Sequence, residues 1–157
     1  MLRRGIALLL VAASALAVAA LPPPNAAART RPCARSEVGQ VIVRFIRALN
    51  AGNAARLDAV FAKEPSFEWY STGAPGRRLG GAAYRRATLI PYFVRRHAQR
   101  ERLTLLSWSG GGNANGYAHF GFRLVRRAKD APRPLRLDGK GAAICTTSGN
   151  TIAVWSM

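Results

Sequence analysis

The sequence predicts one α+β domain in which three helices of the N-terminal half pack against a mostly antiparallel sheet. Two patterns predict this class. Before residue 101, apolar residues recur at every third or fourth position in three stretches, as on the buried face of a helix. After residue 102, apolar and polar residues alternate, as in strands that bury one face. Residues 29–157 suffice for one domain with one hydrophobic core.

The first two helices are predicted to form a hairpin. Ser36 is a favourable N-cap residue, and Glu37 suits the positive end of the helix dipole. The apolar stripe that follows consists of Val38, Val41, Ile42, Phe45, Ile46 and Leu49. Gly52 can take the left-handed conformation that ends a helix, and Asn53 then caps a shorter one. The apolar residues of this second helix are Leu57, Val60 and Phe61.

A third helix is predicted from about Ala83 to Glu101, and Pro91 is expected to kink or restart it because proline lacks a backbone donor. The aromatic stretch Phe67–Ser71 before this helix is typical of a strand. Between the two lies a loop rich in Gly, Pro and Arg, with a short strand expected at Arg77–Leu79.

The rest of the chain is expected to be β. The strands are predicted at Arg102–Trp108, Tyr117–Arg126, Leu135–Cys145 and Thr151–Ser156. Gly110–Gly116 is expected to be a flexible turn, and the last two strands a hairpin. In the second strand, Phe120 and Phe122 share one face, and His119 lies on the other, which we expect to be the convex surface.

The first 28 residues are typical of a secretory signal peptide. Arg3 and Arg4 precede the uncharged run Gly5–Leu21, and cleavage is expected after Ala28. The competing interpretation is an uncleaved anchor, which is disfavoured because the run is shorter than the roughly 20 residues that span a bilayer. We therefore expect a protein secreted or held at the exterior of the cell envelope. No small-apolar lipobox precedes Cys33, so a lipoprotein is not expected.

Cys33 and Cys145 are the only cysteines, and in an oxidising compartment such a pair is expected to form one disulfide. Cys33 lies in a basic, proline-containing lead-in over residues 29–35, ahead of a domain over residues 36–157. A metal or redox site is disfavoured because there is no Cys-x-x-Cys and because His97 and His119 stand at no ligand spacing from either cysteine. We expect no metal and no cofactor.

The chain carries a formal charge of +17 at pH 7, with a pI of about 11.7. Such an excess favours anionic partners without informing on the fold. Nucleic acid is disfavoured because the arginines are spread along the chain and no zinc-finger or aromatic RNA-binding signature is present. An anionic envelope polymer or membrane surface fits better. The alternative is biased composition, since Lys occurs only at positions 63, 129 and 140.

The order of these elements resembles the nuclear-transport-factor-2-like superfamily, which includes the SnoaL-like polyketide cyclases and the ketosteroid isomerases. Phe45–Asn53, with its Gly-Asn junction, resembles the superfamily's first helix pair. Phe67–Tyr70 resembles its first strand, and Gly149–Ser156 resembles its closing strand with an Ile-x-x-Trp run. The resemblance covers nearly all of residues 36–157. The signal and the cysteine pair further suggest an exported, actinobacterial-type subgroup of unassigned function.

The resemblance implies a strongly curved sheet wrapped against the three helices, forming a cone with an apolar pocket at its wide end. We expect this pocket to bind an apolar small molecule or a partner protein. The candidate lining residues are Trp69, Tyr70, Tyr92, His97, Trp108, Phe120, Phe122 and Trp155. For each aromatic the alternative is an ordinary core position. For His97 it is a neutral imidazole hydrogen-bonded in the core.

Two alternatives for the function remain. The first is a small SnoaL-like isomerase, cyclase or hydrolase, although enzymatic activity is disfavoured because the superfamily's catalytic carboxylate sets cannot be aligned. It requires one of Asp58, Asp138, Glu68 or His97 to point into the cavity. No phosphate loop or Gly-x-Ser-x-Gly elbow is present. The second is an envelope-associated basic module that binds an anionic polymer. The superfamily often pairs two copies through the convex face, so a homodimer is a further expectation.

Overall fold

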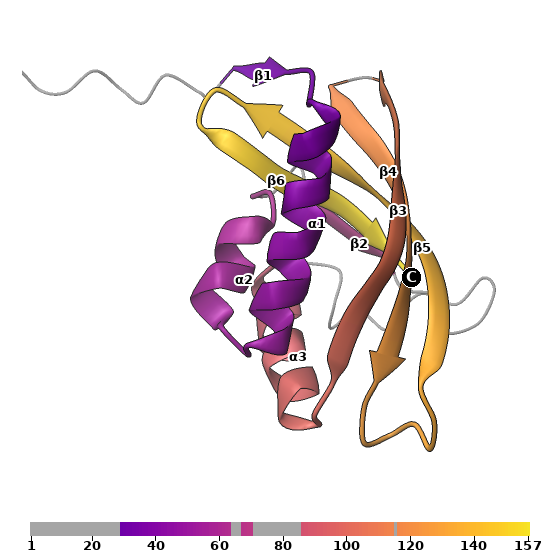
Figure 1. The fold of residues 1–157 in the computed structure, drawn as a ribbon. Helices are drawn as coiled ribbons and strands as arrows, with labels where there is room; N and C mark the ends of the chain where they lie inside the picture. Colours follow the sequence, from indigo (N-terminus) through magenta and orange to yellow (C-terminus); the bar gives the residue numbers. More distant parts are fainter. Residues whose placement is uncertain (1–28, 64–66, 71–85, 115) are drawn as a thin grey trace, which may run out of the picture.

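The computed structural model describes residues 29–63, 67–70, 86–114 and 116–157 (Figure 1). Its helices are α1 (Arg35–Asn50), α2 (Ala54–Val60) and α3 (Arg86–Ala98). Its strands are β1 (Thr30–Arg31), β2 (Glu68–Tyr70), β3 (Arg102–Ala114), β4 (Tyr117–Arg127), β5 (Leu135–Thr146) and β6 (Gly149–Ser156). The expected signal segment with its cleavage point at Ala28, and the short strand expected at Arg77–Leu79, lie outside these residues.

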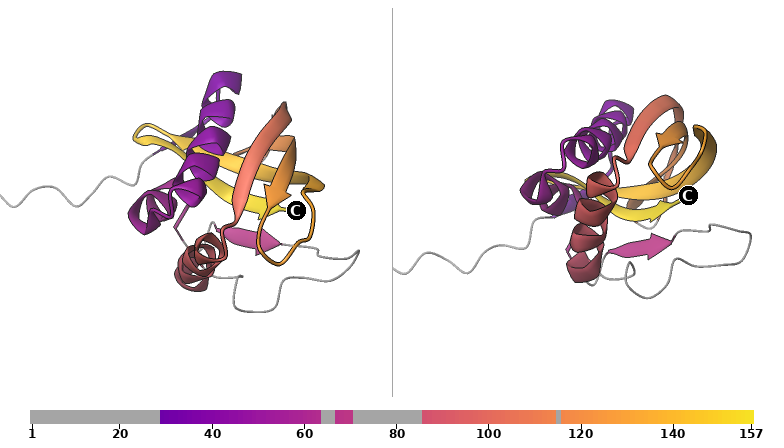
Figure 2. Two further views of the ribbon diagram at one scale, coloured as in Figure 1. Left: turned by 60° about the horizontal axis from the view of Figure 1, so that its bottom comes forward. Right: turned by 90° about the horizontal axis from the view of Figure 1, so that it is seen from below.

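The strands form one six-stranded sheet with the order β2-β6-β5-β4-β3, and β1 pairs with β5. Among the described strands, β2 and β6 run parallel, and the other strand pairings are antiparallel. The sheet curves around the side on which the helices lie (Figure 2). This arrangement confirms the predicted α+β class and the curved, mostly antiparallel sheet packed against three helices.

The start of α1 differs from the prediction. The helix begins at Arg35 with Ala34 as its N-cap, so the expectation that Ser36 caps it was wrong. The Glu37 carboxylate accepts the backbone N–H of Ala34 at 2.8 Å and also two N–H groups of Arg31. A carboxylate at the third helical position can thus satisfy the N-cap donor even where the N-cap residue has no polar side chain.

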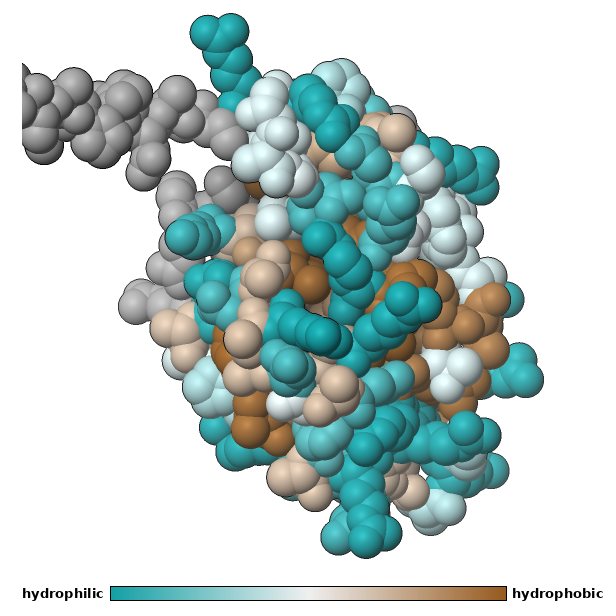
Figure 3. Space-filling model, turned by 60° about the vertical axis from the view of Figure 1, so that its left-hand side comes forward, coloured by the Kyte–Doolittle hydropathy of each residue, from teal (hydrophilic) through white to brown (hydrophobic). Residues whose placement is uncertain are grey.

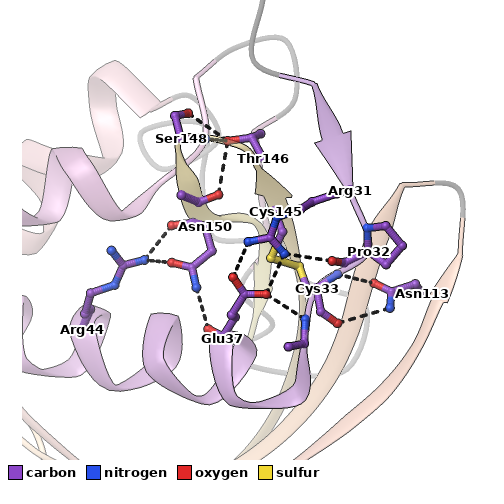
Figure 4. Close-up of polar contacts among 12 residues, drawn as sticks. Arg31, Pro32, Cys33, Glu37, Arg44, Asn113, Cys145, Thr146, Ser148 and Asn150 are labelled. Carbon is purple, nitrogen blue, oxygen red and sulfur yellow. Dashed lines mark hydrogen bonds and ion pairs between the residues drawn. A yellow bond between two sulfur atoms is a disulfide. The ribbon is translucent and has the colours of Figure 1, made fainter.

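The residues ahead of α1 form more than a lead-in. Thr30 and Arg31 pair with Thr146 and Cys145 of β5 as strand β1. Cys33 lies at disulfide distance from Cys145, with their Cα atoms 5.2 Å apart. The same corner is closed by the side chain of Asn113, whose Oδ1 accepts the backbone N–H of Cys33 at 3.2 Å (Figure 4).

The predicted helical hairpin is confirmed. Gly52 adopts a φ of 63°, and the Asn53 side chain accepts the backbone N–H of Arg56 at 2.9 Å, as an N-cap should. All six residues of the α1 stripe are buried, as are Leu57 and Val60 of α2 and Phe61, which follows it. The hairpin therefore presents one continuous apolar surface to the sheet.

The third helix ends at Ala98, before the predicted end at Glu101, and passes through Pro91 without a break. It ends where Arg100 adopts a φ of 59°, and the N–H of Glu101 donates to the carbonyl of Arg96 at 3.0 Å. An arginine occupies this left-handed position, so no glycine marks the end of the helix.

The glycine-rich stretch is strand rather than turn. Strand β3 runs to Ala114, with Gly110 opposite Phe120 and Asn113 opposite Ala118. A register shift between Gly110 and Asn113 absorbs the irregularity, and the chain reverses between Ala114 and Tyr117. Glycine lacks the side chains whose alternation reveals a strand, so the pattern was invisible in the sequence.

Candidate functional site

The concave face of the sheet is floored by aromatic rings. Phe122 of β4 stacks on Trp155 of β6, with ring centroids 4.0 Å apart and planes inclined by 22°. Phe120 lies 6.0 Å from the same indole, and Phe45 of α1 packs on it at 4.5 Å. Because offset and tilted rings in such contact stabilise each other beyond area burial alone, this floor is a rigid apolar surface.

Two cross-strand rows extend this floor toward the edge of the sheet. In one row, Leu105, Leu124 and Leu137 stand opposite one another on β3, β4 and β5. Leu124 is fully buried, whereas Leu105 and Leu137 are only partly buried. In the other row, Phe122 lies between Trp108 and Gly139. The apolar surface is therefore completely covered at its centre and partly open at its sides.

The aromatic residues proposed for the pocket fall into three groups. Phe120, Phe122 and Trp155 are no more than 5% exposed and belong to the core. Tyr92 and Trp108 are half-buried and pack at its border. Trp69 and Tyr70 lie on β2 opposite Trp155 and Ser156, and their side chains are outside the described set.

Trp108 forms a wall between the sheet and α1. A Cβ atom on Gly39 of α1 would lie 2.6 Å from Cζ2 of the indole, so only glycine leaves room for the ring. The guanidinium carbon of Arg35 lies 5.5 Å from the centre of the Trp108 ring, within the range of a cation–π contact. The half-buried indole is thus held against α1, which contributes both Gly39 and Arg35 to the contact.

His97 is packed against the helical hairpin. Its Nδ1 lies 3.1 Å from the carbonyl oxygen of Leu49, and a Cβ atom on Gly52 would lie 2.5 Å from its Cδ2. The contact with Leu49 matches the ordinary interpretation of this residue, a hydrogen-bonded imidazole that joins two helices. His119 is exposed on the face opposite Phe120, as predicted.

Two of the proposed carboxylates form ion pairs at the surface. Asp58 of α2 pairs with Arg86 of α3 at 2.7 Å. Asp138 pairs with Arg123 at 2.8 Å across β4 and β5, on the face opposite Phe122. The third, Glu68, stands opposite Val154 in the parallel β2–β6 pair, and its side chain is outside the described set.

The structure buries a carboxylate that the sequence analysis did not single out. Glu101, only 2% exposed, accepts Nε of Arg96 at 2.6 Å and Nε of Arg126 at 3.0 Å. Both arginines also reach Asp130, at 3.1 and 2.8 Å. Burial raises the pKa of the Glu101 carboxyl above its ordinary value, while the charge of Arg96 opposes that shift.

This network joins the end of α3, the beginning of β3, the end of β4 and the loop that follows. Two acids face two arginines, so the group is electrically balanced, and its geometry suits holding these segments together. One signal in the sequence could have revealed it. Arg126 stands in phase with Phe120, Phe122 and Leu124, so its side chain points inward and requires a buried counter-charge.

No group of three or more His, Cys, Asp or Glu that could hold one metal ion occurs in the described parts of the chain. Among the same residues, no helix combines the length and apolar character needed to cross a bilayer.

The fold recurs in solved structures. A proposed dehydratase of the NTF2-like family from Streptomyces avermitilis superimposes with a TM-score of 0.62 at 12% identity, covering 77% of this chain and 91% of that one. The fold is NTF2-like. An NTF2-like protein with a cystatin-like fold from Novosphingobium aromaticivorans gives 0.59 at 15% identity, covering 78% of this chain and 79% of that one.

A further structural match is a proposed aromatic ring hydroxylase from Novosphingobium aromaticivorans. Its TM-score is 0.60 at 14% identity, with coverage of 78% of this chain and 86% of that one. At such identities the likeness concerns the fold alone. No family model and no curated protein matches the sequence.

Proposed function

We propose that this NTF2-like domain is exported and binds an uncharged, apolar small molecule at the open border of its concave sheet face. The observation that carries the proposal is the row of Leu105, Leu124 and Leu137, which is buried at its centre and partly exposed at both ends. When a ligand covers apolar side chains that are partly exposed beside the aromatic floor, the free energy of the system falls, and this favours binding.

A polar group lies on α3, where Tyr92 packs against the aromatic core. The ring of Tyr92 lies 5.6 Å from Phe93, which belongs to the aromatic core, and the residue is itself half-buried. A phenol is protonated at neutral pH, and burial raises the pKa of Tyr92 further, so its hydroxyl can donate a hydrogen bond. An apolar ligand with one acceptor, such as a carbonyl oxygen, fits this combination.

Support for a small-molecule ligand also comes from the solved neighbours. Two of them are a proposed dehydratase and a proposed aromatic ring hydroxylase. Both names imply small substrates, and we extend only this class of ligand to the present chain. The proposal of export rests on the sequence of residues 1–28, and the N-terminal residue of the protein recovered from culture medium tests it.

Binding can be tested with Nile red, an uncharged apolar dye, by its fluorescence and by the shift of the melting temperature. Leu105→Gln places an amide on the concave border, and Leu106→Gln is its matched control, because Leu106 is 46% exposed in the adjacent bulge. We expect Leu105→Gln to weaken dye binding by about tenfold and Leu106→Gln to leave it within about twofold.

Two results would contradict the proposal. One is the absence of any melting shift with Nile red and with a panel of uncharged apolar ketones. The other is an equal effect of both leucine variants, which would mean that the dye binds exposed apolar surface in general. Tyr92→Phe refines the test. It should weaken the binding of ketones and leave the binding of hydrocarbons of the same shape unchanged.

A further inference from the structure

A second candidate site lies between two helices, and it is separate from the concave face of the sheet. A groove with a volume of about 360 Å³ lies between α1 and α2. It is lined by Arg44, Arg47, Ala48, Arg56, Ala59 and Val60. Figure 3 is turned toward the side on which these helices lie and shows hydrophilic side chains gathered there over hydrophobic patches. We call this cavity the arginine groove.

Among the described residues, no carboxylate pairs with the three arginines of the groove. Every carboxylate whose side chain the structure describes pairs with an arginine outside the groove. Those carboxylates are Glu37, Asp58, Glu101, Asp130 and Asp138, and their partners are Arg31, Arg86, Arg96, Arg123 and Arg126. Among the described side chains, none is therefore left to neutralise the groove.

One of the three arginines is fixed in place by a neutral group. Nη2 of Arg44 donates to the carbonyl oxygen of Asn150 at 2.6 Å and also to its side-chain oxygen (Figure 4). The amide nitrogen of Asn150 in turn donates to the carbonyl of Glu37 at 2.9 Å. This chain orients the guanidinium without cancelling its charge, and its other N–H groups stay available because a guanidinium carries five.

The floor of the groove is small and apolar. Ala48 and Val60 are 2% and 4% exposed, and the exposed Ala59 leaves the groove open on the side of α2. Guanidinium groups bind phosphate oxygens through paired hydrogen bonds. Three guanidinium groups can contact more oxygens than a single carboxylate offers, so an anion with several oxygens fits this groove better than a carboxylate does. The alanine and valine surface can accept a short apolar group attached to that anion.

We infer that the arginine groove binds a phosphate-class oxyanion that carries a short apolar group. The site is separate from the concave face, so it stands or falls independently of the function proposed above. Positive charge spread over the whole surface would also attract anions, but without preference for this groove. The test must therefore separate a local site from general attraction.

The probe is hexyl phosphate, titrated calorimetrically into the purified full chain. The groove variant combines Arg44→Gln, Arg47→Gln and Arg56→Gln. Its matched control combines Arg95→Gln, Arg133→Gln and Arg136→Gln, which removes the same charge from exposed positions outside the groove. We expect the groove variant to bind at least about tenfold more weakly and the control to change by less than about twofold. Equal weakening in both would overturn the inference.

A second pair of variants tests the location without altering charge. Ala59→Leu fills the groove, whereas Ala55→Leu adds the same side chain to an exposed position of α2 outside it. Hexyl phosphate binding should fall by about fivefold or more in the first variant and stay unchanged in the second. Unchanged binding in Ala59→Leu, with both melting temperatures retained, would place the anion elsewhere and overturn the inference.

Vesicles distinguish the two sources of such a group. Flotation with phosphatidylglycerol vesicles, compared with phosphatidylcholine, asks whether the phosphate of a lipid headgroup is bound. Vesicle binding that the groove variant loses would identify a lipid. Hexyl phosphate binding without vesicle binding would identify a soluble organic phosphate. Vesicle binding that survives in the groove variant, with no response to hexyl phosphate, would refute the site.

Discussion

Gly139 of β5 lies directly beneath the ring of Phe122. The two residues are opposite each other across β4 and β5, and a Cβ atom on Gly139 would lie 2.5 Å from Cε2 of the ring and from the carbonyl oxygen of Ser156. Since β5 separates β4 from β6, the missing side chain is what lets Phe122 reach across and stack on Trp155. The aromatic floor thus depends on a residue that contributes no atoms to it.

Gly139→Ala should therefore destabilise the protein by about 1–3 kcal/mol, because the new methyl group forces the ring or the backbone to move. The matched control is Gly121→Ala on β4, whose Cβ atom would meet only the Ser109 hydroxyl at 3.2 Å and a carbonyl at 3.8 Å. Urea denaturation measures both. Equal stability losses would show that Phe122 does not need the space above Gly139.

Glu101→Gln should cost about 3 kcal/mol, because it leaves Arg96 and Arg126, whose side chains are both 14% exposed, with only the more exposed Asp130 as a counter-charge. Asp138→Asn breaks the exposed pair with Arg123 and should cost less than about 1 kcal/mol. The comparison of the two unfolding free energies checks this. A loss at Glu101 no larger than the loss at Asp138 would contradict a structural role for the buried network.

Acidification should destabilise the protein partly through protonation of Glu37. Hydrogen bonds from Arg31 and from the Ala34 N–H lower the pKa of its carboxyl from 4.5 to about 2. A group whose pKa is lowered on folding stabilises the protein above its unfolded pKa, and that contribution is lost as the pH falls through the folded value. The melting temperature of Glu37→Gln should therefore fall less than that of the unaltered protein over this acid range. Asp138→Asn controls for the lost charge.

Reduction of the cysteine pair should lower stability by roughly 3 kcal/mol. The sequence separation of Cys33 and Cys145 is 112 residues, and cross-linking so long a loop removes much of the entropy of the unfolded chain. Melting with and without reductant measures the effect. The Cys33→Ser/Cys145→Ser variant should melt at the temperature of the reduced protein, and reductant should not change its melting temperature. A change with reductant in that variant would show that the effect does not come from this disulfide.

The parts of the fold that could be predicted are those with a periodic or capping signal. The stripe from Val38 to Leu49, the Gly52–Asn53 junction and the alternation around Phe120 all led to the correct elements. Gly110–Gly112 carries no alternation, and strand β1 is too short to show any, so neither could be recognised. Both exist because β4 and β5 offer backbone partners from elsewhere in the chain.

The aromatic floor and the arginine groove were harder to predict from the sequence, because both depend on contacts between residues that are far apart in the chain. The stripe and alternation indicated that Phe45, Phe122 and Trp155 are apolar positions, but only the register across β5 shows that they meet. The arginine groove requires knowing which arginines the few acids neutralise. That pairing joins Glu101 with Arg126, and Asp58 with Arg86, and no local pattern predicts it.

The link between Cys33 and Cys145 also constrains how the molecule is made. Its first thiol precedes all three helices, and its second belongs to β5, so the bond cannot form until 112 further residues have been synthesised. Until then Cys33 is a free thiol. The bond therefore depends on an oxidant that acts after β5 has been synthesised.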